Sequence, residues 1–480
     1  MDNIANQTVS TTMWATVEKI STMGIQFVIS MLLARLLSPA DYGAIAMLMI
    51  FMAIGQQFIE CGFSNALIRK QDCTQIDYST AFIFNIVVGV VAYFLLFIIA
   101  PIVGRFYKMP ILIDVLRVYG FVLILNSFTI VQNAILTKNL NFKIMAKVNT
   151  LNSLVSGIAG LVCAFYGMGV WALVCQSVIG AFFSAIFMSY VTKWRPSAIF
   201  SNTSFRYLWG FGSKMLVTGL ISVIYGNIYS LVIGKIYDSK ALGLFNRGQN
   251  TAQLFPNIVG SVFGRSTLPL LSQVQNDKTR LTYVYRQFAI VGSFLNFPLV
   301  FLIMALASPF ILFFLTDKWA GAIIYVQIFA ISMLTSAAGS VNLNLLQAMG
   351  RSDYTLRAEV IKKGLGFITV AALFNFGPLV LAVGSSIFNI LCYFINLYYA
   401  RKVLGISYMV QLKDLSPYFI TSFLMFIFVY FFTAIVPSNL LKLVLGTFIG
   451  GLVYFLITKY ILKVPYYNKI FEMVKQKCNK

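Results

Sequence analysis

Residues 79–102 read STAFIFNIVVGVVAYFLLFIIAPI and contain no charged side chain. A helix rises about 1.5 Å per residue, so a run of this length can cross the roughly 30 Å hydrocarbon core of a bilayer. The run lacks the alternation of apolar and polar residues that marks the strands of a membrane β-barrel. Because a spanning segment must satisfy its own backbone hydrogen bonds, the run predicts a transmembrane α-helix.

About fourteen such apolar stretches follow one another along the chain, most of them at or above the roughly 17–25 residues that one span requires. They are predicted at residues 12–37, 42–64, 79–102, 111–136, 148–167, 170–191, 206–234, 241–271, 283–315, 321–346, 355–375, 378–400, 415–436 and 440–461. The chain is 59% hydrophobic and 10% charged, whereas soluble domains carry about 25% charged residues. The predicted fold class is therefore an all-α polytopic membrane protein.

The residue types of common catalytic and metal sites are scarce. The chain has no His, and its 6 Cys are scattered without a C-x-x-C pair. We therefore predict no catalytic residues, no metal site, no cofactor and no disulfide framework. The N-terminal Met1-Asp2-Asn3 lacks the basic region of a signal peptide, so the first span is expected to stay in the mature protein.

Basic residues concentrate in alternate loops, which predicts the orientation of the chain. When the N-terminus is placed inside, the inside loops and the C-terminal tail hold about three times as many Lys and Arg as the outside loops. The outside loops and span ends hold Arg35, Arg105, Lys108, Arg117, Lys235, Lys240, Lys318 and Lys442. Both termini are thus expected to be cytoplasmic. The net charge of +22 then reflects topology and contact with anionic lipid, and no nucleic-acid partner is predicted.

An internal repeat predicts how the helices are grouped. Residues 28–37 (VISMLLARLL) match residues 228–237 (IYSLVIGKIY), so that Arg35 meets Lys235, and further on Gly43 meets Gly243. The elbow at 133–143 (NAILTKNLNFK) similarly resembles 344–357 (NLLQAMGRSDYTLR). Because about six helices per copy is an even number, both copies insert in the same orientation, related by an axis along the membrane normal.

The repeat predicts two six-helix lobes followed by two further helices. The expected divisions are an N-lobe at 1–200, a C-lobe at 201–405, helices 13 and 14 at 406–462, and a cytoplasmic basic tail at 463–480.

Ionisable residues inside the predicted spans are the candidate functional residues, because charge is costly there and usually faces a cavity. The substrate-binding candidates are Arg247, Arg265, Lys214 and Lys19, and the candidates for ion coupling or counter-charge are Glu18 and Glu60. The excess of cations indicates an anionic ligand, and a guanidinium can bind two phosphate oxygens at once. The interval from 247 to 265 is five helical turns, which places both arginines on one side, about 27 Å apart.

Ordinary structural roles compete with the functional ones. Arg35 and Lys235 end their spans, where long basic side chains extend to the interface. Lys214 lies about two turns into its span and can also reach the interface. Solvation at the end of a helix explains the presence of a carboxylate at Glu60 equally well as a role in ion coupling.

Three segments resemble the polysaccharide exporters of the Wzx and colanic-acid-exporter type, in the multidrug/oligosaccharidyl-lipid/polysaccharide (MOP) superfamily. They are RLLSPADYG (35–43), ALGLFNRGQNTAQLFPNIVGSVFGRSTLPLLSQVQND (241–277) and LLQAMGRSDYTLR (345–357). The resemblance implies a bacterial inner-membrane flippase, not an enzyme, with twelve or fourteen helices in two lobes. Such proteins export undecaprenyl-pyrophosphate-linked oligosaccharide, a unit of O-antigen, capsule or exopolysaccharide.

The resemblance also bears on site residues and partners. It implies substrate contact for Arg247 and Arg265, with membrane lipid and a glycan polymerase as candidate partners. The pair Glu18-Lys19 departs from any simple cationic pattern in the first span.

Two other function classes stay open at this stage. A small-molecule or drug/ion antiporter of the same superfamily is expected to have an acidic cavity, whereas this one is predicted to be basic. A membrane-embedded glycan polymerase or ligase needs catalytic groups in sizeable outer loops, and the outer loops here are nearly all short. Alternating access between the two lobes is the expected mechanism.

Overall fold

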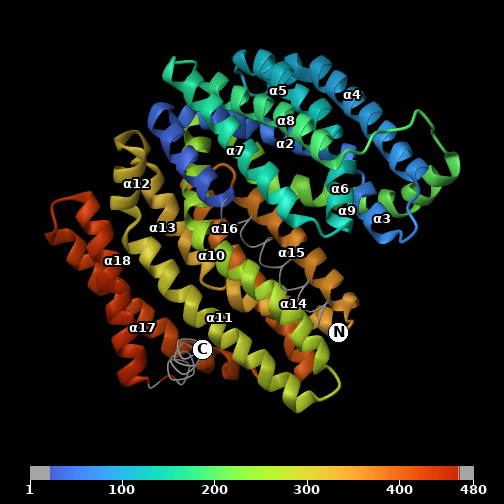
Figure 1. The fold of residues 1–480 in the computed structure, drawn as a ribbon. Coiled ribbons are helices and arrows are strands. Elements are labelled where there is room, and N and C mark those ends of the chain that lie inside the picture. The colour runs from blue at the N-terminus through green and yellow to red at the C-terminus, as the bar shows by residue number, and fades with distance from the viewer. Residues whose placement is uncertain (1–21, 463, 465–480) are drawn as a thin grey trace, which may run out of the picture. The chain divides into compact units, whose positions relative to one another are not determined.

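The computed structural model describes residues 22–462 and 464, and at residues 261, 262, 264 and 265 it describes the main chain alone. Every regular element in that part of the chain is a helix (Figure 1). The helices form two compact units, Met1–Gly243 and Leu244–Lys480, which we call unit 1 and unit 2. Each unit has hydrophobic clusters of its own.

Unit 1 begins with the helix Thr22–Leu36. It continues through α2 (Pro39–Glu60), α3 (Phe63–Arg69), α4 (Gln75–Phe106), α5 (Ile111–Ser127), α6 (Ile130–Lys138), α7 (Phe142–Phe165), α8 (Val170–Thr192) and α9 (Asn202–Ile236), coloured blue to green in Figure 1. Neighbours along the chain pack together, α4 with α5 and α7 with α8. The contact of α2 with α9 joins segments that are far apart in the sequence.

Unit 2 takes in most of α10 (Ser239–Gln273), which begins just before the boundary. It continues through α11 (Lys278–Ala305), α12 (Ala307–Leu315), the short η1 (Asp317–Trp319), α13 (Ala322–Met333), α14 (Ser336–Ala348), α15 (Ser352–Leu373), α16 (Pro378–Leu404), α17 (Tyr408–Ile435), α18 (Asn439–Leu456) and η2 (Ile457–Ile461). The last long helices belong to this unit, because α17 packs on α11 and α18 packs on α12 and α17.

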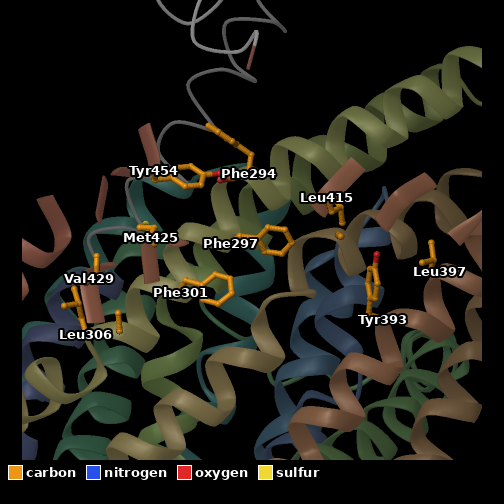
Figure 2. Close-up of a cluster of buried hydrophobic side chains, with 12 residues drawn as sticks. Phe294, Phe297, Phe301, Leu306, Tyr393, Leu397, Leu415, Met425, Val429 and Tyr454 are labelled. Atoms are coloured by element: carbon orange, nitrogen blue, oxygen red, sulfur yellow. The ribbon is translucent and has the colours of Figure 1, made fainter. Parts of the chain in front are cut away.

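Aromatic and aliphatic side chains form a buried cluster in unit 2 (Figure 2). Phe294, Phe297 and Phe301 follow one face of α11 at helical spacing and pack against residues of α17 and α18. The hydroxyl of Tyr454 on α18 donates a hydrogen bond to the main-chain oxygen of Phe294 at 2.8 Å. In a bilayer such close packing and satisfied polar groups hold helices together, because the surrounding lipid is as apolar as the side chains.

In the described part of the chain, eleven helices are long and apolar enough to cross a membrane, judged by length and composition. Each apolar segment predicted from the sequence lies on a helix wherever the structure describes it. The predicted segments outside those eleven are 12–37, which is described only from residue 22 onward, and the segments on the more polar helices α10 and α15. The chain is therefore a multi-pass, all-helical membrane protein. The count of fourteen spans and the lobe boundary at residue 200 stay predictions.

The two turns matched by the repeat, before α2 and before α10, are both capped. Ser38 and Asp41 form a capping box, in which the Ser38 hydroxyl accepts from the Asp41 N–H at 3.3 Å and the Asp41 carboxylate accepts from the Ser38 N–H at 2.9 Å. Before α10, the carboxylate of Asp238 accepts from the N–H of Ala241 at 2.6 Å.

These two turns also touch each other through their glycines. A Cβ atom on Gly43 would lie 1.7 Å from the main-chain oxygen of Ser239, and one on Gly243 would lie 1.9 Å from that of Pro39. The two contacts are reciprocal, because Pro39 corresponds to Ser239 in the same register in which Gly43 corresponds to Gly243. Only glycine lets the main chains approach this closely.

Candidate functional site

The structure does not place all the predicted site residues. Glu18 and Lys19 lie outside the described residues, as does the side chain of Arg265, whose main chain belongs to α10. Pro256 stands between Arg247 and Arg265 in that helix. A proline removes one hydrogen bond from the helix ladder and bends it, so the straight-helix separation of about 27 Å stays a prediction.

Glu60 and Lys214 lie on two helices of unit 1 that touch, α2 and α9. A Cβ atom on Gly212 would come within 2.4 Å of the main-chain oxygen of Cys61, so the two main chains are nearly in contact there. Glu60 directly precedes Cys61, and Lys214 follows Gly212 by two residues. The structure therefore brings these two predicted residues to the same level of unit 1.

A chain of hydrogen bonds leads to Glu60 from α5. The side-chain amide of Asn126 donates to the Gln56 Oε1 at 3.1 Å, and the Gln56 amide donates to the Glu60 carboxylate at 3.1 Å. On the adjoining face of α2, Gln57 packs so closely on α9 that a Cβ at Gly219 would lie 2.2 Å from its amide nitrogen. Glu60 itself is exposed.

Lys214 stands on an exposed polar stripe of α9. Thr218 and Ser222 follow it at intervals of one turn, and both are exposed or half-buried. The hydroxyl of Thr218 donates to the main-chain oxygen of Lys214 at 2.5 Å, and that of Ser222 donates to the oxygen of Thr218 at 2.9 Å. In the described part of the chain, Lys214 belongs to none of the ion pairs.

Arg247 lies in a different setting, on α10 in unit 2. It is only 8% exposed, and its guanidinium carbon lies 5.7 Å from the centre of the Trp319 ring. Tyr325 packs so closely on the adjoining Gly248 that a Cβ there would lie 2.3 Å from the Tyr325 Cβ. Phe245 contacts the Tyr325 ring edge-on at 5.8 Å. The Arg247 guanidinium thus lies over an indole face, which stabilises a cation, in a part of unit 2 rich in aromatic side chains.

One face of α10 is polar and open. Asn250 and Asn257, two turns apart, are both exposed, and Gln253 lies between them on the same side. Lone exposed amides in a long helix of a membrane protein indicate a surface that meets water or a polar ligand rather than lipid.

Four of the eleven acidic side chains in the described residues form an ion pair with a basic side chain. Asp414 accepts two hydrogen bonds from the guanidinium of Arg286, each at 2.7 Å, and ties α17 to α11. Asp77 pairs with Lys70 at 2.7 Å, and Glu359 pairs with Lys362. None of these ion pairs includes Lys214 or Glu60, and the cationic excess predicted from the sequence stays a prediction.

A further pair caps the elbow at 344–357. Arg351 donates two hydrogen bonds of 3.0 Å to Asp353, and these lower the pKa of that carboxyl to about 2. Both side chains are partly exposed, and the pair orders the turn before α15.

No group of three or more His, Cys, Asp or Glu side chains within residues 22–462 is arranged to hold a metal ion. The sequence interpretation rests mainly on charged residues and does not single out Gln56 or Asn126. Their signal was present, because each is a carboxamide within an otherwise apolar span.

Comparison with known proteins gives the family. The family described as "Polysaccharide biosynthesis protein" matches residues 32–324, which is more than half of the chain. The chain belongs to this family. It is 22% identical over 420 residues to the lipopolysaccharide biosynthesis protein WzxC of Escherichia coli (strain K12), covering 85% of this chain and 83% of WzxC.

Solved structures share the fold of this family member. The lipid II flippase MurJ in an inward closed conformation superimposes with a TM-score of 0.76 at 15% identity, covering 94% of this chain and 98% of MurJ. An inward-facing multidrug resistance MATE family transporter of the MOP superfamily gives a TM-score of 0.59 at 14% identity, covering 82% and 98%. The chain therefore has the fold that these two transporter structures share.

Proposed function

We propose that this protein is a flippase that moves undecaprenyl-pyrophosphate-linked oligosaccharide from the cytoplasmic to the outer leaflet of a bacterial inner membrane. Membership of the polysaccharide biosynthesis family and the similarity to WzxC support this role. So does the fold shared with a lipid II flippase. We propose no catalytic residues and no cofactor.

One observation carries the proposal. Lys214 is exposed on a polar stripe of an apolar helix, with no acidic partner in the described part of unit 1. An ammonium in that position needs an anion, and a pyrophosphate supplies charged oxygens for it. We propose that Lys214, Arg247, Arg265 and Lys19 contact the pyrophosphate during transport. Glu18 and Glu60 are the proposed counter-charges or ion-coupling groups.

The proposed architecture has fourteen spans, with two six-helix lobes related by the repeat, helices 13 and 14, and both termini in the cytoplasm. The reciprocal glycine contacts at Gly43 and Gly243 support the repeat, because a pair of related turns that meet across an axis must make each contact twice. The lobes would move against each other in alternating access. A reporter fused after Lys70 or Arg195 should be cytoplasmic, and one after Pro110 or Gly377 external.

The main alternative is a small-molecule or drug/ion antiporter of the same superfamily. The fold does not separate the two classes, because a flippase and a multidrug transporter both share it. The ion pairs favour the flippase. A carrier of cations needs unpaired carboxylates, and Asp77, Glu359 and Asp414 pair with basic side chains, whereas Glu60 belongs to none of the ion pairs in the described residues.

A flipping experiment tests the proposal. Purified protein is reconstituted in liposomes with a fluorescent undecaprenyl-pyrophosphate-linked sugar, and a membrane-impermeant quencher reports the fraction in the outer leaflet. We expect flipping that depends on the protein. Undecaprenol, which carries no phosphate, should not inhibit it. A protein that leaves the lipid in place, yet exchanges cationic drugs for protons or sodium ions, would establish the antiporter instead.

A further inference from the structure

Unit 1 contains a cavity of about 260 Å³ between the helix Thr22–Leu36, the start of α2, α7 and α8. Its polar lining consists of Gln26, Ser30, Tyr42, Ser153, Ser156 and Gln176. Aliphatic side chains complete the wall. No role assigned above involves this cavity.

The polar residues that line the cavity are spaced so that those on one helix lie on the same face of that helix. Gln26 and Ser30 are one turn apart on the first helix, and Ser153 and Ser156 are nearly one turn apart on α7. Gln26 is exposed, so the cavity reaches the surface of unit 1 at that side chain. Ser153, by contrast, is 7% exposed and forms part of the floor.

Close glycine contacts fix the walls in place. A Cβ on Gly160 would lie 2.9 Å from the Cβ of Gln176, and one on Gly180 would lie 3.0 Å from the Cβ of Ser156. On the same seam between α7 and α8, the Oδ1 of Asn152 is buried and accepts no hydrogen bond within the described residues. The seam therefore packs tightly yet keeps polar groups in a part of the chain that is otherwise apolar.

The chemistry of the lining excludes charged ligands. None of the residues that line the cavity carries a charge, so neither a phosphate nor a metal cation finds its usual partner there. Hydroxyls and carboxamides both donate and accept hydrogen bonds, which is what a neutral polyhydroxylated ligand requires. The volume is slightly below the roughly 300–1,000 Å³ of ordinary small-molecule sites, which suits a single ring.

We propose that this cavity of unit 1 is a binding site for one neutral sugar ring, whose hydroxyls bond to Gln26, Gln176 and the serines of α7 while its C–H face packs on the aliphatic wall. The inference rests on the proposed function in that the ring would be a sugar of the lipid-linked oligosaccharide. A free sugar has the same chemistry, and the two sources need separate measurements.

The test measures affinity with and without the sugar. Full-length protein in lipid nanodiscs is titrated with undecaprenyl pyrophosphate and with its glucosyl, galactosyl and N-acetylglucosaminyl derivatives. We expect at least one sugar to tighten binding about tenfold, the effect of one or two uncharged hydrogen bonds. Gln176→Met, which keeps the length of the side chain, and Ser153→Ala should each remove most of that gain and leave the affinity for the sugar-free lipid unchanged.

Ser184→Ala is the matched control, because Ser184 lies about two turns further along α8 and outside the cavity. It should keep the full gain. If no sugar tightens binding in the wild type, or if Gln176→Met weakens both kinds of lipid equally, the cavity is not a sugar site.

A second arm identifies the source of the sugar. The methyl glycoside of the preferred sugar is added in excess. If the free glycoside binds by itself, with an affinity that accounts for the increase in lipid affinity caused by the sugar, the site takes free sugar. If the sugar increases affinity only when it is attached to the lipid, the site takes the transported glycan. If the wild type binds no pyrophosphate lipid at all, the proposed flippase function fails. Glycoside binding that Gln176→Met abolishes would still support the sugar site in that case.

Discussion

Two successive helices, α9 and α10, have the same length of 35 residues and each carries a candidate substrate cation, yet they present it in opposite ways. On α9, Lys214 is exposed beside a stripe of hydroxyls. On α10, Arg247 is 8% exposed and lies over Trp319. The difference shows that charged residues within spans can have different structural roles. An exposed lysine is available to a ligand, whereas a buried arginine is also part of the packing.

The largest expected effect is a loss of folding stability when a tightly packed glycine is replaced. Gly243→Ala, at the start of α10, places a Cβ 1.9 Å from the main-chain oxygen of Pro39, so the main chain has to move. We expect a loss of roughly 1–3 kcal/mol or more, seen as poor recovery of folded protein in size-exclusion chromatography.

Gly234→Ala, at the end of α9, is the matched control for that substitution. Its Cβ would meet side chains rather than main chain, the flexible Met47 at 2.9 Å from Cγ and the Tyr107 ring at 3.1 Å from Cε1. It should cost less than about 1.5 kcal/mol. Equal recovery of the two variants would mean that the turn before α10 is free to shift.

The second prediction separates the two roles of Arg247. Arg247→Ala should abolish flipping and also lower thermal stability by roughly 1–3 kcal/mol, because it leaves a cavity beside Trp319. Arg247→Met fills most of that space and should recover stability without recovering transport. Arg247→Lys should recover transport partly, since it supplies charge without the planar fork. Normal flipping by Arg247→Met would make this arginine purely structural.

The third prediction concerns Lys214. Because this lysine is exposed and belongs to no ion pair in the described residues, Lys214→Gln should change stability by less than about 0.5 kcal/mol. Flipping should nevertheless fall by about tenfold, equivalent to about 1.4 kcal/mol of lost substrate interaction. The initial flipping rate in liposomes and the unfolding temperature of the same sample measure both. A loss of stability with an unchanged flipping rate would show that Lys214 has a structural role and does not contact substrate.

The smallest effect is expected at the end of α9. Lys235 is exposed, its ammonium donates to the main-chain oxygen of Phe106 at 2.6 Å, and it lies 4.1 Å from the centre of the Phe106 ring. Lys235→Gln should cost at most about 1 kcal/mol and leave the flipping rate within experimental error. A marked loss of transport would show that the basic ends of the spans also handle substrate.

The sequence predicted the helices well, because the apolar composition of a stretch long enough to cross a bilayer is sufficient to predict a helix. Runs such as 79–102 admit only a helix in lipid, and α4 covers that run from Gln75 to Phe106. The repeat aligned Gly43 with Gly243, and both glycines lie where the two turns touch, but the repeat itself stays a prediction. The sequence did not predict the breaks within spans, as between α2 and α3, where Cys61 and Gly62 both adopt positive φ.

The candidate site was predicted only in part. Charged residues stand out in apolar sequence, so Glu60, Lys214 and Arg247 were found. The burial of Arg247 was not predicted, because it depends on Trp319 and Tyr325, which approach from elsewhere in unit 2. The uncharged cavity of unit 1 was not predicted either. Serines and glutamines spaced along three helices look unremarkable until packing brings them together.

The sequence by itself determined that this chain is a helical membrane protein with an excess of basic residues inside its spans. Both properties are sums over residues or local patterns, and a hydrocarbon solvent leaves no alternative to the helix. Only the tertiary structure decided which of those charges are buried, which helices touch, and where an uncharged cavity forms. These depend on glycines that let particular helices approach, such as α2 with α9 and α7 with α8, and contacts between distant segments leave no periodic trace in the sequence.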